Sequence, residues 1–211
     1  MKITKFGHAC LLIEEGEARL LLDPGVYSAG FEALADLDAI LVTHQHADHM
    51  TPDTIKALLK SNASAKVLAD EASAAQLVAA GVAAQAVHNG DELAIAGVKV
   101  SVIGVEHALI HPDIPRIPNV GYLVAERFFY PGDNFTNPGR PVEVLSAPIG
   151  APWLKISEAV DYVRGVKPAV AIPVHDAVLA IPEMNYNLLQ RLTADRGIEV
   201  RVVPNGQSTE V

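Results

Sequence analysis

Side chains that can bind metal ions are concentrated in one short polar segment of the sequence. Thr43-His44-Gln45-His46-Ala47-Asp48-His49 contains the pattern HxHxDH, directly after an apolar stretch that is typical of a buried strand. Residues two apart on an extended backbone point the same way, so His44 and His46 can face one metal ion. Asp48 and His49 follow on a turn and can face a second ion. Ordinary packing gives no reason to place these four side chains together.

Further ligands are expected at the ends of later strands, because one turn supplies too few for a complete site. Three positions qualify: His107, Asp133 and His175 each follow an apolar run typical of a strand. Strand ends on one edge of a sheet lie close together, so these side chains can converge with the HxHxDH turn. His111 is an alternative to His107, which we favour because it lies nearer the end of its strand.

The elements that must position these residues form two similar halves. The periodicity predicts strands at residues 2–14, 18–22, 39–43 and 65–69, and helices at 52–60 and 73–80. The second half predicts strands at 93–95, 98–105, 120–126, 127–130, 142–147, 169–173 and 199–203, and helices at 156–163 and 186–196. The proline-rich stretch 107–119 predicts a loop. No low-complexity linker separates the halves, so we expect one α/β domain over residues 1–211, with two packed sheets and outer helices.

Composition excludes several classes of protein. The chain has 211 residues, 50% of them hydrophobic, which excludes a disordered chain. Its single cysteine, Cys10, excludes an internal disulfide and thiolate clusters, so any metal must be held by nitrogen and oxygen. A net charge of -9 counts against a general nucleic-acid binder. No stretch approaches the roughly 18 apolar residues of a membrane span, and no signal-peptide pattern is present. A cytoplasmic location is therefore expected.

The sequence resembles the metallo-β-lactamase-fold hydrolases. The resemblance rests on the HxHxDH turn and on these further segments: Phe6-Gly7-His8, Leu22-Asp23-Pro24-Gly25, His107, Pro131-Gly132-Asp133 and Ile172-Pro173-Val174-His175. It is similar above all to the UlaG-like and UPF0173-like branch, which shares a segment like Pro148-Ile149-Gly150. The family implies a four-layer αββα sandwich, two mixed β-sheets with outer helices, and a dinuclear site between the sheets. Asp176 departs from the family, in which an aromatic residue tends to follow the late histidine.

The resemblance also implies how the ligands are shared between two divalent ions. One ion takes His44, His46 and His107, the other takes Asp48, His49 and His175, and Asp133 bridges both. Zinc is favoured, and imidazole and carboxylate ligands also accept manganese, iron or nickel. Two such ions roughly 3.5–4 Å apart would hold a bridging water and lower its pKa toward about 7.

The predicted function is a metal-dependent hydrolase that uses a metal-bridging hydroxide to cleave an ester, lactone or phosphodiester bond. Its substrate is a small molecule, and Arg116, Arg140 and Lys155 are candidates for binding an anionic one, although each is an ordinary surface charge by default. Asp48 is expected to orient the hydroxide as a metal ligand. His8 is either a hydrogen-bonded core residue or a catalytic residue that contacts substrate or protonates the leaving group.

Several questions stay open at the level of sequence. Alternative functions are a nuclease on the same fold, and a non-hydrolytic iron-dependent redox or metal-binding protein. A homo-oligomer is compatible with the sequence. Asp23 is expected to support a metal-binding histidine. His88, beside Asn89-Gly90, is expected in a surface turn, and Cys10 in the core.

Overall fold

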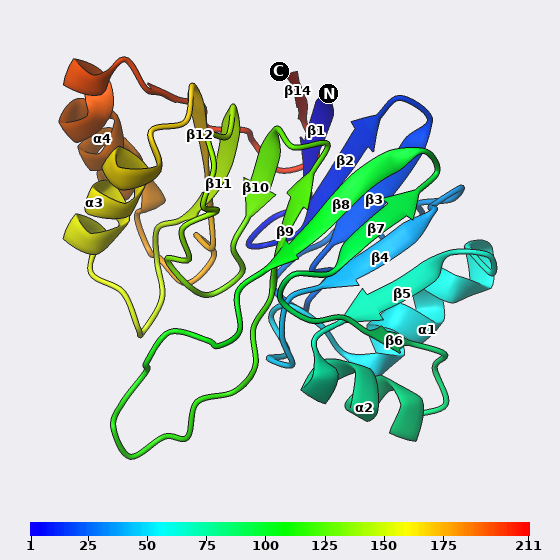
Figure 1. The fold of residues 1–211 in the computed structure, drawn as a ribbon. Helices are drawn as coiled ribbons and strands as arrows, with labels where there is room; N and C mark the ends of the chain where they lie inside the picture. The colour runs from blue at the N-terminus through cyan, green and yellow to red at the C-terminus, as the bar shows by residue number, and fades with distance from the viewer.

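Two seven-stranded sheets face one another, and helices cover the outer face of each (Figure 1). The computed structural model describes residues 1–211. The first sheet has the order β14-β1-β2-β3-β4-β5-β6, and the second has the order β13-β12-β11-β10-β9-β8-β7. Both sheets mix parallel and antiparallel pairs. The predicted αββα four-layer sandwich is confirmed.

The two sheets are built from separate parts of the chain, except at β14. The first sheet contains β1 (Lys2–Lys5), β2 (Leu11–Glu15), β3 (Ala18–Leu22), β4 (Ala39–Val42), β5 (Lys66–Ala69), β6 (Gln85–Ala86) and β14 (Ser208–Glu210). The second contains β7 (Glu92–Ile95), β8 (Val98–Ile103), β9 (Gly121–Val124), β10 (Phe128–Tyr130), β11 (Val144–Pro148), β12 (Val170–Val174) and β13 (Glu199–Val200). The helices are α1 (Pro52–Ser61), α2 (Glu71–Ala79), α3 (Ile156–Val166) and α4 (Pro182–Thr193), with a 3-10 turn at Ala194–Arg196.

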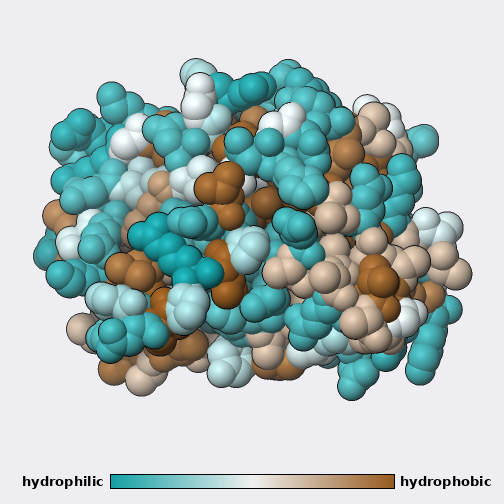
Figure 2. Space-filling model, turned by 60° about the horizontal axis from the view of Figure 1, so that its bottom comes forward, coloured by the Kyte–Doolittle hydropathy of each residue, from teal (hydrophilic) through white to brown (hydrophobic).

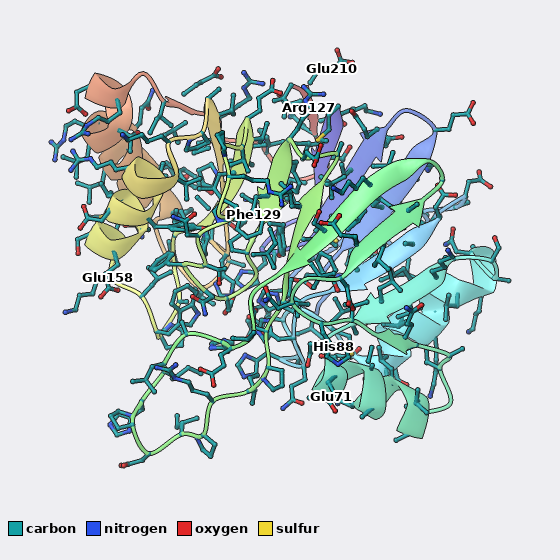
Figure 3. All side chains as sticks on the ribbon, in the orientation of Figure 1. Glu71, His88, Arg127, Phe129, Glu158 and Glu210 are labelled. Carbon is teal, nitrogen blue, oxygen red and sulfur yellow. The ribbon has the colours of Figure 1, made fainter.

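Alternation along the strands sorts apolar side chains into three cores. In β3, Leu20 and Leu22 pack between the sheets, whereas Leu21 faces α1 and α2. Phe129 of β10 faces the other way, toward α3 and α4, and Figure 3 labels it in the second sheet. Both faces of these strands are buried, so their sequences are nearly continuous apolar runs. No helix is long and apolar enough to cross a membrane.

Most predicted elements are confirmed, with boundary shifts of a few residues. Helix α4 begins at Pro182, four positions before the predicted start, because proline is accommodated in the first helical turn. The predicted strands 98–105 and 199–203 end earlier, at Ile103 and Val200. Two short strands, β6 and β14, were not predicted, since Gln85–Ala86 and Ser208–Glu210 carry no apolar pattern.

The prediction of one strand over residues 2–14 is wrong. The structure divides it into β1 and β2, which pair antiparallel with Ile3 opposite Ile13. Gly7 lies in the connecting turn at φ +104°, a conformation that glycine adopts without strain. The turn is closed by a hydrogen bond from the Phe6 amide to the Cys10 carbonyl, 2.9 Å long. His8 therefore lies on the turn between β1 and β2 and not within a strand.

Two tyrosines of the second sheet are hydrogen-bonded to the backbone of the first. The Tyr122 hydroxyl donates to the Val42 carbonyl at 2.8 Å, and the Tyr130 hydroxyl donates to the Ala9 carbonyl at 2.7 Å. Both side chains are fully buried. Val42 precedes the HxHxDH segment and Ala9 follows His8, so these bonds join the sheets close to the predicted ligands.

Candidate metal centre

The structure brings all seven predicted metal ligands and His8 into one cluster between the ends of the two sheets. They come from the β1–β2 turn, the end of β4, the loop between β8 and β9, and the ends of β10 and β12. In Figure 1 the long β8–β9 loop extends at the bottom of the molecule, and Figure 2 turns this end toward the viewer. Hydrophobic and hydrophilic side chains are interspersed on that face.

The first candidate ligand group consists of His44, His46 and His107, which lie together in the structure. Their ligand atoms lie within 4.8 Å of one another. The Nε2 atom of His44 lies 3.1 Å from the Nδ1 atom of His46, so the two rings face one point. His44 and His107 are buried, and His46 is half-buried at the mouth of the cluster.

The second candidate ligand group contains Asp48, His49 and His175, which also lie together. The Oδ2 atom of Asp48 lies 3.4 Å from Nε2 of His175 and 3.7 Å from Nε2 of His49. His8 joins this group, with its Nε2 atom 3.1 Å from the same carboxylate oxygen.

Asp133 lies between the two groups. Its Oδ1 atom is 3.1 Å from Nε2 of His49, and its Oδ2 atom is 3.1 Å from Nε2 of His175 and 3.4 Å from Nε2 of His107. One carboxylate thus contacts histidines of both groups. This position is the one that a bridging ligand would occupy.

Two of the histidines are fixed by backbone carbonyls. The Nδ1 atom of His107 lies 2.6 Å from the Ala108 carbonyl, and that of His175 lies 2.5 Å from the Gly150 carbonyl. A carbonyl oxygen only accepts, so each ring carries its proton on Nδ1. Whenever the ring is neutral, its Nε2 atom is then a lone-pair donor aimed into the cluster.

Asp23 fixes two more histidines in the same tautomer. Its Oδ2 atom accepts from Nδ1 of His49 at 2.7 Å and from the Thr43 hydroxyl at 2.6 Å. Because that hydroxyl gives its proton to Asp23, it accepts from Nδ1 of His44 at 3.0 Å. The structure thus places Asp23 behind two ring nitrogens, as expected for an outer carboxylate that orients metal-binding histidines.

The donor set fits divalent ions. The Nε2 atoms of His49, His107 and His175 and the Oδ1 atom of Asp133 are buried without a hydrogen-bond partner. Buried polar atoms are seldom left unpaired, so such a cluster needs a ligand. Nitrogen and oxygen ligands at 2.0–2.2 Å in tetrahedral geometry are about 3.4 Å apart. The separations of 3.1 to 3.7 Å described above match that spacing.

The two groups differ in the pKa values of their histidines. Burial lowers the pKa of His44 well below its ordinary value and also lowers that of His46. Burial acts in the same direction on His175, but the charge of Asp133 and the close contacts of Nε2 with the Asp133 and Asp48 carboxylates outweigh it and raise the pKa to about 9. The pKa of His49 is raised in the same way by Asp133 and Asp23.

The two central carboxyl groups have lowered pKa values. Burial by itself raises the pKa of Asp133, but the charges of His49 and His175 outweigh it and hold that pKa well below its usual range. The pKa of Asp48 is lowered because the close contact with His175 and the hydrogen bond from His8 outweigh the effect of burial. Both groups are therefore ionised at neutral pH.

Two glycines allow the backbone to approach the ligands closely. A Cβ atom on Gly25 would lie 1.9 Å from the Asp48 carbonyl oxygen, so the Asp-Pro-Gly turn reaches the HxHxDH turn only with glycine there. Gly132 adopts φ +66°, and a Cβ atom on it would lie 2.4 Å from Oδ1 of Asn119. His175 itself adopts φ +60°, a conformation that costs roughly 1–2 kcal/mol in a non-glycine residue and that clusters at functional sites.

Other candidate residues lie outside the cluster. His111 is exposed near Asp113, so only His107 of the two alternatives reaches the cluster. His88 is exposed in a turn, beside Glu71 at the start of α2 (Figure 3). Arg140 pairs with Glu126 in the β9–β10 turn. Two surface predictions and one core prediction agree with the structure: Lys155 and His88 are exposed, and Cys10 is buried.

Trp153 is the residue that sequence analysis missed. Its indole Nε1 donates to Oδ2 of Asp133 at 2.8 Å, and its ring lies 6.1 Å from that of His107. Trp153 is the only tryptophan of the chain and follows the Pro148-Ile149-Gly150 segment at the end of β11. Its position after β11, at the same sheet edge as Asp133 and His175, could have indicated that Trp153 lies near the predicted ligands.

Comparison with known proteins identifies the family. The family model of the beta-lactamase superfamily domain matches residues 2–175. The chain belongs to the beta-lactamase superfamily.

Relatives within this superfamily match almost the whole chain. Protein Rv0786c of Mycobacterium tuberculosis is 47% identical over 209 residues, 97% of each chain. A UPF0173 metal-dependent hydrolase of Methanocaldococcus jannaschii is 26% identical over 223 residues, covering 99% of this chain and 100% of that one. The structure of Igni18, a metallo hydrolase from Ignicoccus hospitalis, superposes with a TM-score of 0.78 at 19% identity, covering 100% and 98% of the two chains. The predicted superfamily and its UPF0173-like branch are confirmed, and these relatives agree with the prediction of a metal-dependent hydrolase.

Proposed function

We propose that this metal-dependent hydrolase cleaves an ester, lactone or phosphodiester bond in a small-molecule substrate. Anionic small molecules are among the proposed substrates. The observation that carries the proposal is the pair of ligand groups that share Asp133. In this proposal His44, His46 and His107 hold one divalent ion, and Asp48, His49 and His175 hold the other. Zinc suits these imidazole and carboxylate ligands, and manganese, iron and nickel are the alternatives. We further propose that residues 1–211 act as one catalytic domain in the cytoplasm, which agrees with a buried, unpaired Cys10.

The chain's own residues prepare the site for this chemistry. Bound ions would supply a water that ionises near neutral pH and a positive charge that polarises the bond to be cleaved. Asp23 and the backbone carbonyls hold the imidazoles in the binding tautomer. Asp48 is ionised and faces two imidazoles, so it acts as a ligand and not as a free general base.

A small cavity beside the first ligand group limits what binds there. Its volume is about 60 Å³, and it is lined by His46, His107, Arg116 and apolar residues of the β8–β9 loop. Since one water occupies about 30 Å³ of liquid, only a small substituent of a substrate would fit. Arg116 supports an anionic substituent, although it is already paired with Glu106 at 2.7 Å.

The two alternative functions have less support. A nuclease needs a cationic surface for the phosphate backbone, whereas the chain carries a net charge of -9. A non-hydrolytic iron protein would use the same ligand types, so elemental analysis of protein purified without added metal separates it from a zinc hydrolase.

A substrate panel tests the proposal. Zinc-loaded protein is assayed with p-nitrophenyl acetate, a γ-lactone and bis(p-nitrophenyl) phosphate, and we expect turnover of at least one. His46→Ala should lower kcat/KM by more than about 100-fold, since a lost ligand should cost more than a lost outer partner.

His111→Ala is the matched control, because His111 is exposed on the same loop as His107 and lies outside the cluster. Its kcat/KM should equal that of the unaltered protein. The proposal fails if the zinc-loaded protein turns over no compound of the panel, or if His46→Ala and His111→Ala behave alike.

A further inference from the structure

His8 contacts two residues of the second ligand group, Asp48 and His175, and is fully buried. Its exposed fraction is 0%, and its ring lies against those of His175 and Tyr27, with centroids 3.9 and 5.3 Å away. Its side chain contacts Asp48 through Nε2 at 3.1 Å. Its carbonyl oxygen accepts from the His175 amide at 2.7 Å. The ring is therefore enclosed by protein side chains.

The tautomer of His8 is the reverse of that of the four fixed histidines. The Ala177 amide donates to Nδ1 of His8 at 3.2 Å. A backbone N–H only donates, so Nδ1 of His8 is the acceptor and the proton of the neutral ring lies on Nε2. That Nε2–H points at Oδ2 of Asp48, and it has no lone pair to offer a metal ion.

The Ala177 amide is held in place by a buried ion pair. The ammonium group of Lys5 contacts Oδ2 of Asp176 and also lies 3.3 Å from the Pro173 carbonyl. The Tyr186 hydroxyl donates to the same Asp176 oxygen at 2.5 Å. Lys5 and Asp176 are 1% and 8% exposed. These contacts anchor the segment after β12 to the end of β1. The segment after β12 contains Ala177 and therefore sets the tautomer of His8.

We propose that His8 is a positioning residue for the second ligand group and not a ligand itself. Its Nε2–H fixes the carboxylate of Asp48, and its carbonyl fixes the backbone of His175, so one residue orients two ligands that come from different sheets. The inference rests on the ligand assignment of the proposed function. If His8 has this role, the affinity of the second ligand group for its metal ion depends on His8. The affinity of the first group does not, because His8 does not contact that group.

Metal titration tests this role without any substrate. Metal-free protein is titrated with zinc by calorimetry, and with cobalt while the visible spectrum is recorded. His8→Ala should bind the first equivalent as the unaltered protein does and bind the second about 10- to 100-fold more weakly. His8→Gln should recover most of that loss, because a carboxamide can accept from Ala177 and donate to Asp48 at once. The cobalt spectrum should change for the second equivalent in His8→Ala alone.

The controls separate this role from the alternatives. His88→Ala removes an exposed histidine and should leave both equivalents unchanged. A ligand role for His8 is indicated, and the proposal overturned, if His8→Gln binds the second equivalent as weakly as His8→Ala. A purely structural role is indicated, and the proposal again overturned, if both equivalents weaken together with the thermal unfolding midpoint. Failure of the substrate panel would reject the hydrolase proposal and leave these titrations unaffected.

Discussion

The two ligand groups differ in charge although they lie side by side. The first contains three imidazoles, and burial lowers the pKa of two of them, His44 and His46. In the second group the carboxylate Asp48 accompanies His49 and His175, whose pKa values are raised, that of His175 to about 9. His44 and His46 are therefore neutral and ready for a cation, whereas His49 and His175 must release protons. We expect the first group to fill first at neutral pH.

Among the substitutions that test this difference between the two groups, Asp133→Asn should have the largest effect on activity and metal content. The substitution keeps the shape but removes the charge that both groups share, and it also removes the main cause of the raised pKa of His175. We expect kcat/KM to fall by more than about 100-fold and the second metal equivalent to be lost, measured by steady-state kinetics and elemental analysis. Asp53→Asn, on the exposed start of α1, is the control. Full metal content in Asp133→Asn would contradict a bridging role.

Asp23→Asn should have the next largest effect and should act on both groups. Asp23 accepts from His49 directly and from His44 through Thr43, so its loss frees both rings to change tautomer. Outer partners of this kind contribute about 10- to 100-fold in metal affinity. Zinc titration should therefore show both equivalents weakened, in contrast to the single equivalent affected in His8→Ala. An effect confined to one equivalent would show that Asp23 serves only one group.

The pH dependence of metal binding should distinguish the two groups further. The metal-free protein holds a proton on His175 up to about pH 9, and a ligand must lose that proton. Affinity for the second equivalent should thus rise with pH by about tenfold per unit for each proton released, and level off above the pKa. Calorimetry at pH 6.5, 7.5 and 9 in buffers of different ionisation enthalpy measures the affinity of each equivalent and the number of protons released. If metal affinity changes equally with pH for the two equivalents, the two groups do not differ in protonation in this way.

Trp153→Phe should have the smallest effect. Phenylalanine keeps an aromatic ring beside His107 and Phe135 but removes the N–H that donates to Asp133. One hydrogen bond to a charged group contributes about 1.5–3 kcal/mol, and the lower end of that range corresponds to the roughly tenfold fall in zinc affinity that we expect. Because Trp153 is the only tryptophan, its fluorescence in the unaltered protein should also change on zinc binding. An unchanged affinity would mean that the indole serves packing alone.

Sequence alone predicted which candidate ligands lie together, because each follows a strong local pattern. The HxHxDH segment follows a buried strand, and Asp133 and His175 follow apolar runs that end at the same sheet edge. Turns and weak edge strands were predicted less well. The turn at Gly7 interrupts a continuous apolar run, so only the pairing of β1 with β2 shows it. The tautomer of His8 depends on the Ala177 amide, 169 positions away, and no sequence pattern encodes such a contact.

The buried tyrosine hydroxyls that join the sheets have a thermodynamic consequence. Tyr122 and Tyr130 bind carbonyls of the first sheet next to the ligand-bearing segments, so the gap between the sheets is set by the protein itself. Metal binding then has little chain entropy to remove, unlike in zinc fingers, where the ion drives folding. Chelation should accordingly leave a folded protein that recovers its full metal content when the ions are returned.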